Sequence, residues 1–364
     1  MSLTDTLRTA ISTVRDSDLD RTLGELNALR DIVVEDGRVN IYLELVQPVH
    51  WIARSVDEAV KAAVHGIDAS LECIVHAIEK ETPRIGNAHV LPQVKNLIAV
   101  ASGKGGVGKS TMAANLACAL SLRGARVGLL DADIYGPSAP TMFGLHNATM
   151  NAEKMEDGRI VGYPNVQYGI EIASIGFVMQ RDQAAILRGP MLAGYFKTLV
   201  EQINWGELDF LIFDLPPGTG DIQLTLTQQI PLTGAVIVTT PQEIALADVR
   251  RSIAMFNKVQ VDVLGVVENM SYFIPPDAPE KKYHIFGEGG GRQVAHEAGV
   301  PLLGNIPINL ALREGADDGL PAVMNPDTDY SIVSTISDMA AAVVKQTRII
   351  NARRIDAPRL TISL

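Results

Sequence analysis

Residues 102–111 read "SGKGGVGKST", a glycine-rich stretch with lysines at positions 104 and 109. The part from Gly103 to Ser110 fits the pattern G-x-x-x-x-G-K-[ST], whose glycines let the backbone fold around phosphate groups with its N–H groups pointing inward. An apolar run, "LIAVA", precedes this stretch, and a helical pattern, "TMAANLACALSLRG", follows it. The strand–loop–helix context favours a phosphate-binding loop over a glycine-rich turn without a ligand.

The chemistry of such a loop assigns expected roles to its residues. Lys109 should pair with the β- and γ-phosphates of a nucleotide, and the Ser110 hydroxyl should ligate Mg²⁺. The amino terminus of the following helix adds partial positive charge. We therefore expect bound ATP and Mg²⁺, with further contacts from the rest of the loop: Gly103, Lys104, Gly105, Gly106, Val107, Gly108 and Thr111.

From about Asn96 onward, short apolar strands alternate with amphipathic helices. Continuous apolar strands separated by helices predict an α/β fold with a doubly wound, mainly parallel sheet that is covered on both faces. A helix over residues 328–348 is expected to close this domain. The expected strands are "LIAVAS", "RVGLLDAD", "DFLIFDLPP", "GAVIVTT", "VLGVVENM" and "LLGNIPI".

The first eighty residues have the pattern of a small α+β domain. Leu7, Ile11 and Val14 share one face of a predicted helix, and Asp36-Gly37 separates two apolar runs, which is a strong hairpin signal. "VDEAVKAAVHGI" then predicts a helix and "SLECIVHAI" a strand. The expected domains are 1–80 for this unit, 81–95 for a linker, 96–348 for the phosphate-loop domain and 349–364 for a tail. Pro358 breaks the tail, so it makes a poor amphipathic anchor.

Composition narrows the classes of function. Of the 364 residues, 47% are hydrophobic and 20% charged, and the net charge is −11. This acidic balance argues against a partner nucleic acid held by phosphate neutralisation. The N-terminus lacks the basic segment followed by an apolar run that would predict a secretory signal. No apolar run is long enough for a helix that spans a membrane. We therefore expect a cytoplasmic protein without a membrane partner.

Aspartates follow two of the predicted strands. Asp131 and Asp133 end "RVGLLDAD", and Asp214 ends "DFLIFD". Carboxyl ends of strands in doubly wound sheets face the ligand crevice, where a carboxylate holds Mg²⁺ directly or through water. Asp214 is the leading metal candidate, although each aspartate alone is compatible with a solvated strand end. Gly218 and Gly220 would let the next loop respond to the γ-phosphate.

The extra lysine in "KGGVGKS" is typical of one class of P-loop ATPases, which includes partition and division-site ATPases. Further segments resemble, within that class, the Mrp/ApbC-type iron–sulfur cluster carriers over about residues 96–344. The first domain is similar to the small cluster-assembly-type domain often fused ahead of them. The segments are "DIYGPSAPTMFGL", "LRGPMLAGYF", "DFLIFDLPPGTGD", "VIVTTPQEIAL", "ENMSYF" and "IFGEGGG".

The resemblance implies a nucleotide-gated homodimer that hydrolyses ATP slowly and works with iron–sulfur assembly or acceptor proteins. In such a dimer Lys104 acts on the nucleotide of the other subunit. Asp133 positions the attacking water, and Asp131 lies near the Mg²⁺ shell. Asn269 hydrogen-bonds the adenine, with an Asx turn as the alternative.

One departure from the family concerns the cluster. Many members carry Cys-x-x-Cys soon after "ENMSYF", where two subunits bridge a [4Fe–4S] cluster, but this chain has "IPPDAPEKKYH". His284 there is expected to be a surface or capping residue, and Cys73 and Cys118 to be buried apolar residues. We therefore identify no cysteine cluster ligands. A nucleotide-gated scaffold, or a positioning ATPase, that carries no cluster of its own remains the alternative.

A second departure lies in the first domain, where relatives often place a cysteine in the loop after the hairpin. This chain has "VQPVHWIARS" in that loop. His50 and Trp51 are expected to be packing or surface residues.

Overall fold

The computed structural model describes residues 2–84, 89–134, 136–178 and 189–357. Parts of four sequence predictions lie outside these ranges: residues 85–88 of the linker, Tyr135 of "DIYGPS", the first two residues of "LRGPMLAGYF", and the break at Pro358. The chain divides into two compact units, one formed by residues 1–83 with 344–364 and the other by residues 84–343.

An eight-stranded sheet forms the centre of the larger unit, in the order β10-β11-β7-β12-β6-β13-β14-β15. β10 pairs antiparallel with β11, and the other neighbouring strands are parallel. The six predicted strands are all present in it. The strands are β6 (Val94–Ala101), β7 (Val127–Asp131), β10 (Asn165–Gln167), β11 (Ile170–Ser174), β12 (Leu208–Asp214), β13 (Gly234–Thr239), β14 (Val263–Phe273) and β15 (Leu302–Ile308).

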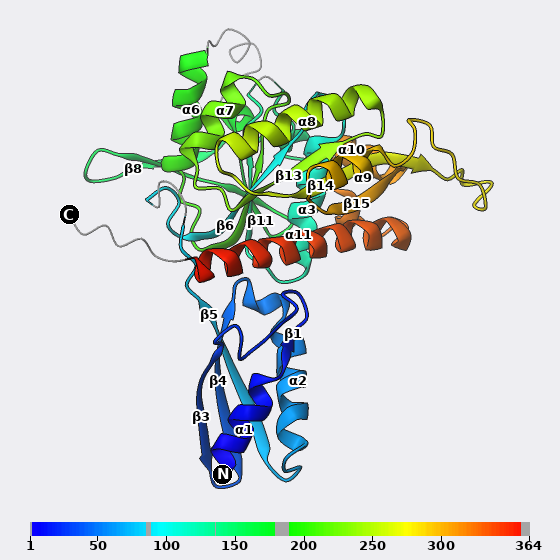
Figure 1. The fold of residues 1–364 in the computed structure, drawn as a ribbon. Helices are drawn as coiled ribbons and strands as arrows, with labels where there is room; N and C mark the ends of the chain where they lie inside the picture. The colour runs from blue at the N-terminus through cyan, green and yellow to red at the C-terminus, as the bar shows by residue number, and fades with distance from the viewer. Residues whose placement is uncertain (1, 85–88, 135, 179–188, 358–364) are drawn as a thin grey trace. The chain divides into compact units, whose positions relative to one another are not determined.

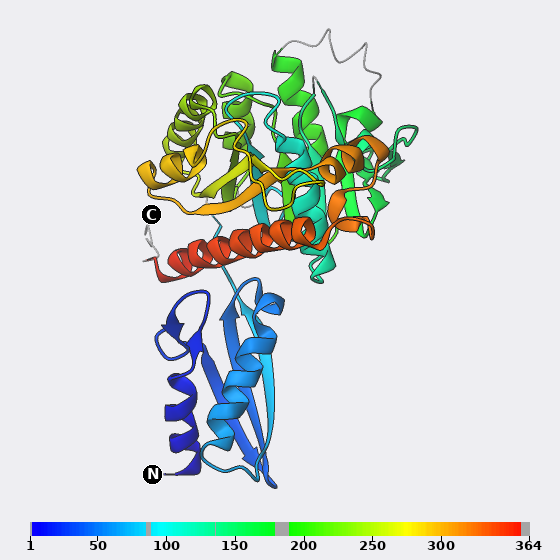
Figure 2. The same cartoon turned by 90° about the vertical axis from the view of Figure 1, so that its right-hand side faces the viewer.

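Helices cover both faces of this sheet (Figures 1 and 2), which confirms the predicted doubly wound α/β fold. Every residue of β7, β12 and β13 is buried, as expected for strands covered on both sides. The helices are α3 (Lys109–Leu122), α4 (Ala139–Met142), α6 (Gly189–Glu201), α7 (Asp221–Gln229), α8 (Glu243–Lys258), α9 (Gly290–Glu297), α10 (Leu310–Asp318) and the first part of α11 (Tyr330–Asp356).

Four strands of the larger unit are absent from the sequence predictions. β8 (Asn151–Lys154) and β9 (Ile160–Tyr163) form a separate antiparallel hairpin. β10 and β11 extend the main sheet beyond β7. The parallel pairing of β11 with β7 places Ser174 opposite Asp131, so this added strand reaches the edge of the sheet where the predicted site residues lie.

The smaller unit contains the α+β elements predicted from the sequence. Its sheet has the order β3-β4-β5, and Figure 2 shows α1 and α2 along this sheet. The hairpin turn is at Asp36 and Gly37, both with positive φ, and Leu7 and Ile11 are fully buried. The elements are α1 (Leu3–Ser12), β1 (Arg15–Asp16), β2 (Arg21–Thr22), β3 (Leu29–Glu35), β4 (Arg38–Val46), η1 (Val49–Trp51), α2 (Ala53–His65) and β5 (Glu72–Lys80).

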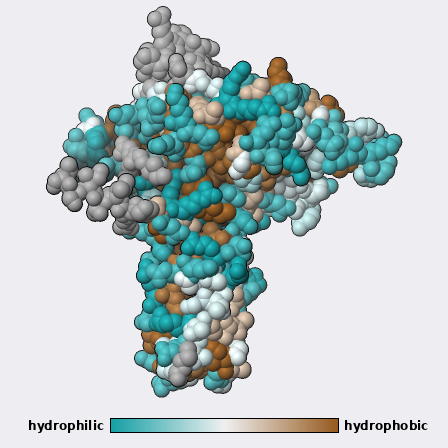
Figure 3. All heavy atoms as spheres, in the orientation of Figure 1, coloured by the Kyte–Doolittle hydropathy of each residue, from teal (hydrophilic) through white to brown (hydrophobic). Residues whose placement is uncertain are grey.

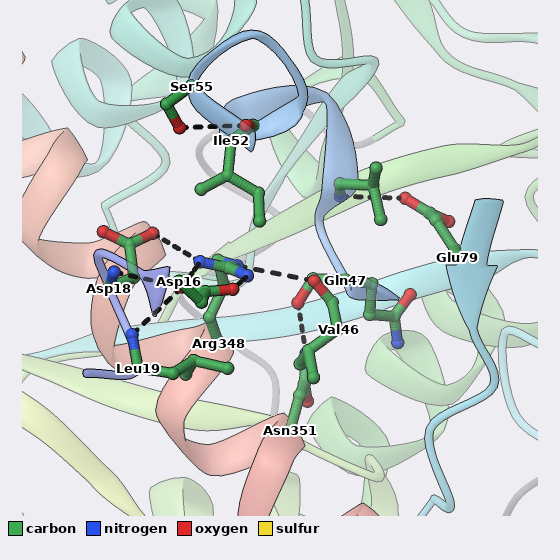
Figure 4. Close-up of polar contacts among 11 residues, drawn as sticks. Asp16, Asp18, Leu19, Val46, Gln47, Ile52, Ser55, Glu79, Arg348 and Asn351 are labelled. Atoms are coloured by element: carbon green, nitrogen blue, oxygen red, sulfur yellow. Dashed lines mark hydrogen bonds and ion pairs between the residues drawn. The ribbon is translucent and has the colours of Figure 1, made fainter. Parts of the chain in front are cut away.

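The last helix, α11, continues past Arg348 to Asp356, and its residues from Val344 onward belong to the smaller unit. Arg348 is fully buried there, with its guanidinium 2.5 Å from Asp16 and 2.7 Å from Asp18 (Figure 4). The Asn351 amide donates to the carbonyl of Gln47 at 3.3 Å. Through these polar contacts the end of α11 packs as part of the smaller unit, which the sequence patterns did not indicate.

The described helices include none that is both long and apolar enough to cross a membrane. On the face drawn in Figure 3, hydrophobic residues show among hydrophilic ones over the larger unit.

Candidate functional site

The loop of residues 102–108 joins the end of β6 to the start of α3, as the motif predicts. Gly108 is the N-cap of α3 with φ of +82°, and Gly106 has φ of +77°, so both need the freedom of glycine. No side chain caps α3. The first N–H groups of the helix are therefore available to an anion, with the helix dipole behind them.

Lys109 and Asp214 meet beneath this loop. The Lys109 ammonium nitrogen lies 2.5 Å from Asp214 Oδ1 and donates to the Ser110 hydroxyl at 3.2 Å. Both side chains of the ion pair are buried. The structure thus brings together Lys109, Ser110 and Asp214, which the sequence assigns to phosphate and magnesium binding.

Asp131 lies beside Asp214, because the two residues are register partners on neighbouring strands. Its carboxylate accepts from the backbone N–H groups of Ser138 and Ala139, each at 2.9 Å, and from the Ser174 hydroxyl at 3.1 Å. Complete burial and the nearby charge of Asp214 raise its pKa to about 7. Asp131 therefore orders the segment that leads into α4.

Asp133 is half-buried and belongs to the same loop. Its backbone N–H donates to Asp131 at 3.2 Å, and its carboxylate accepts from the Gly136 N–H at 3.3 Å. The loop after β7 thus holds Asp133 next to the buried Asp131, at the carboxyl edge of the sheet.

Lys104 has a partner within its own chain. Its ammonium donates to the side-chain oxygen of Gln242 at 3.3 Å, and its carbonyl accepts from the Ser102 hydroxyl at 2.9 Å. The side chain is half-buried. Gln242 is the N-cap of α8, so this contact joins the amino terminus of α8 to the loop.

Two close contacts clamp the loop. A Cβ atom on Gly103 would come 2.5 Å from backbone and side-chain atoms of Asp248 in α8, and one on Gly108 would come 2.2 Å from Asn269 Nδ2. The buried Asn269 amide also donates to the Val107 carbonyl at 2.8 Å. Asn269 therefore supports the loop, and its side-chain oxygen remains an acceptor for a hydrogen bond with a base.

The loop between β12 and α7 is tied to the phosphate loop by a backbone hydrogen bond. The N–H of Gly218 donates to the carbonyl of Ser102 at 3.0 Å, and φ of Gly218 is +100°. Gly220 is the N-cap of α7. Both glycines named in the sequence predictions thus lie in the loop that connects Asp214 to α7.

The two cysteines are buried in different units, Cys73 in β5 and Cys118 in α3. Burial raises the pKa of both thiols. His284 Nδ1 lies 3.2 Å from the Ser271 carbonyl oxygen. Across the described ranges, no three or more His, Cys, Asp or Glu side chains are grouped so that they could hold a metal ion.

Comparison with known protein families identifies both parts of the chain. The family described as ParA, NUBPL iron-transfer P-loop NTPase, matches residues 93–344. The chain belongs to this family. Residues 4–72 match the family described as iron-sulfur cluster assembly protein. The resemblance to iron–sulfur carriers is thereby confirmed, and so is the prediction of a nucleotide-binding ATPase of the ParA type.

Individual relatives agree with the family assignment. An iron-sulfur cluster carrier protein of Synechocystis is 48% identical over 328 residues, which cover 89% of this chain and 92% of that protein. One of Escherichia coli is 42% identical and covers 89% and 88%. A nucleotide-binding protein of Archaeoglobus fulgidus, solved with ADP, has 37% identity and a TM-score of 0.57, covering 67% of this chain and 94% of that one.

The sequence did not predict the roles of Ser174, whose hydroxyl donates to Asp131, of Gln242 or of Gln223. Gln242 stands in the segment "TTPQEIAL", which supported the resemblance but received no role, although it contacts Lys104. Gln223 follows the motif "DLPPGTGD", and its burial has no signal in the sequence beyond its helical spacing from Leu226 and Ile230.

Proposed function

We propose that this member of the family is a nucleotide-gated homodimer that binds and hydrolyses ATP at two facing sites and serves iron–sulfur cluster assembly or transfer. The convergence of Lys109, Ser110 and Asp214 beneath an uncapped helix terminus carries the proposal. When nucleotide binds, the Lys109 ammonium pairs with the β- and γ-phosphates and gives up part of its contact with Asp214. The loop backbone from Gly103 to Thr111 surrounds the phosphates.

The oxygen donors at the site suit Mg²⁺. The Ser110 hydroxyl would ligate it, and the carboxylates of Asp214 and Asp131, at the ends of β12 and β7, would hold it directly or through water. When bound, the ion neutralises charge that develops on the phosphate oxygens. Asp133 orients the attacking water, and the free side-chain oxygen of Asn269 accepts from the adenine amino group.

Lys104 connects hydrolysis with dimer assembly. Its ammonium leaves Gln242 and reaches the phosphates of the other subunit's nucleotide, where a cation stabilises the transferring phosphoryl group. Hydrolysis then removes the contact that holds the two sites together, and the dimer changes its geometry.

The iron–sulfur cluster is the cargo, and the described residues do not fit a resident cluster. Thiolates are the usual ligands, and Cys73 and Cys118 are buried in separate units with raised pKa values. We propose that the chain holds a cluster only with thiols of a partner, an assembly or acceptor protein in the cytoplasm. The same burial favours a second candidate, a nucleotide-gated scaffold that binds no cluster itself.

Anaerobic reconstitution with iron and sulfide, followed by desalting and iron analysis, tests this assignment. We expect ATP hydrolysis in Mg²⁺ and a labile, substoichiometric cluster in the isolated chain. A stable cluster near one per dimer that survives in a Cys73→Ala/Cys118→Ala variant would contradict the proposed ligand supply. One that disappears in that variant would make a core cysteine a ligand.

A further inference from the structure

Helix α7 begins directly after the loop that leaves Asp214. Its inward stripe consists of Gln223, Leu226 and Thr227, continued by Ile230 just beyond the helix. Leu226 and Ile230 belong to the hydrophobic core of the larger unit. In Figure 1, α7 lies beside α6. Gln223 is the amide side chain on this buried stripe, and it lies in the first turn of the helix, at the end that follows the Asp214 loop.

Gln223 is 2% exposed, and neither its amide nitrogen nor its amide oxygen has a hydrogen-bond partner among the residues that the structure describes. Thr227, one turn later, is equally buried, but its hydroxyl donates to the Leu224 carbonyl at 2.9 Å. A buried amide without a partner lowers the population of its conformation by about 5- to 150-fold. Unpaired buried amides are uncommon in native proteins, and a catalytic or strained position is one of the explanations for them.

A backbone N–H group that could pair with the Gln223 amide lies close to it in the chain. With Gly220 as N-cap, Gln223 is the third residue of the helix, from which a glutamine side chain can accept a hydrogen bond from the N-cap N–H. Here that hydrogen bond is absent. The N-cap belongs to the loop whose Gly218 N–H is bonded to the Ser102 carbonyl next to the phosphate loop. A change in this loop therefore changes the access of Gln223 to the loop backbone.

We propose that Gln223 is a positioning residue for ATP hydrolysis, whose amide hydrogen-bonds the backbone of the Asp214–Gly220 loop only when bound nucleotide rearranges that loop. The unpaired amide disfavours the arrangement described above, and the nucleotide-bound arrangement relieves it. Gln223 thus adds to the energetic difference between the two loop states. The inference deepens the proposed function and rests on it.

The test compares Gln223→Met, Gln223→Glu and Gln228→Met. Methionine keeps the length and helix propensity of glutamine without its amide. Gln228 is exposed on the same helix, so its variant is the matched control. Glutamate keeps an acceptor at the same reach. Melting temperature with and without Mg²⁺-ATP, kcat and KM are measured for each purified chain.

We expect Gln223→Met to melt about 2–8 °C higher than the wild type without nucleotide, because it removes an unpaired buried amide. Its gain in melting temperature with Mg²⁺-ATP should be smaller, and its kcat about tenfold lower with little change in KM. Gln223→Glu should retain more activity than Gln223→Met. Gln228→Met should match the wild type in every measurement.

Three results would overturn the inference: a wild-type kcat in Gln223→Met, a lower melting temperature of that variant without nucleotide, or an undiminished Mg²⁺-ATP shift. Failure of the proposed function has a different signature, because the wild type itself would then lack hydrolysis. A wild type that binds but does not hydrolyse ATP still tests the inference through the melting shifts. A wild type with neither ATP hydrolysis nor a melting shift in Mg²⁺-ATP would contradict both the proposed function and this inference.

Discussion

The ammonium nitrogen of Lys109 lies 2.5 Å from a carboxylate oxygen of Asp214, and the two buried side chains join the first turn of α3 to the end of β12. The motif "GKGGVGKS" predicts the lysine, and the apolar strand "DFLIFD" predicts the aspartate at its end. Because both charges are buried, the pair combines a role in stability with its proposed role at the phosphates, and these roles can be separated by experiment.

Lys109→Met should reduce ATP hydrolysis by at least about 100-fold, since it removes the cation that stabilises the transferring phosphoryl group. It should also lower the free energy of unfolding by about 3–5 kcal/mol, because Asp214 is left buried without its partner. The double variant Lys109→Met/Asp214→Asn should recover most of the stability and none of the hydrolysis. Phosphate release and urea unfolding are the measurements.

The control for this pair is Lys258→Met, which removes an exposed lysine from α8. It should leave both quantities within error of the wild type. Unchanged phosphate release by Lys109→Met would contradict the assignment of the loop.

Lys104→Ala should bind ATP but hydrolyse it poorly, because we place this lysine at the other subunit's nucleotide. Mixing it with Asp133→Ala chains decides the question. In a mixed dimer both substitutions fall at one site, and the other site has neither. After subunit exchange, hydrolysis should return to about one quarter of the wild-type level, as expected for random two-fold pairing.

Subunit exchange in that mixture is followed independently with two fluorescent labels. If exchange is complete and hydrolysis stays at the level of the separate variants, Lys104 acts within its own chain, where Gln242 already contacts it.

The sequence predicted those parts of the molecule whose signals are local. Buried parallel strands such as β12 are apolar runs, and the phosphate loop has fixed spacing. β11 was missed because it is short, and Glu171 interrupts its apolar residues. Its place depends on pairing with β7, which lies far away in the chain. The contact of Gln242 with Lys104 and the burial of Gln223 likewise depend on tertiary packing, which no spacing rule reveals.

Both cysteine thiols should resist an aromatic disulfide reagent in the folded chain, because burial limits access and raises their pKa values. Raising the pH from 7 to 9 should accelerate labelling of the unfolded chain far more than labelling of the folded chain, in which burial raises the pKa of both thiols. Absorbance of the released thiolate, with and without guanidinium, measures both rates. A Cys73→Ser variant isolates Cys118, and rapid labelling of either folded chain would identify an accessible thiol and a possible cluster ligand.

Arg348→Met should destabilise the smaller unit by about 3–5 kcal/mol, because it leaves the buried Asp16 and the nearby Asp18 without their cation. The two tryptophans lie in different units, so a Trp205→Phe background leaves Trp51 as the fluorescence reporter of the smaller unit. Urea unfolding in that background measures the loss. Arg353→Met, which changes an exposed arginine on the same helix, is the control. Equal midpoints for the two variants would show that the buried arginine contributes no more than a surface one, and adding Asp16→Asn to Arg348→Met should restore part of the loss if the unpaired carboxylate causes it.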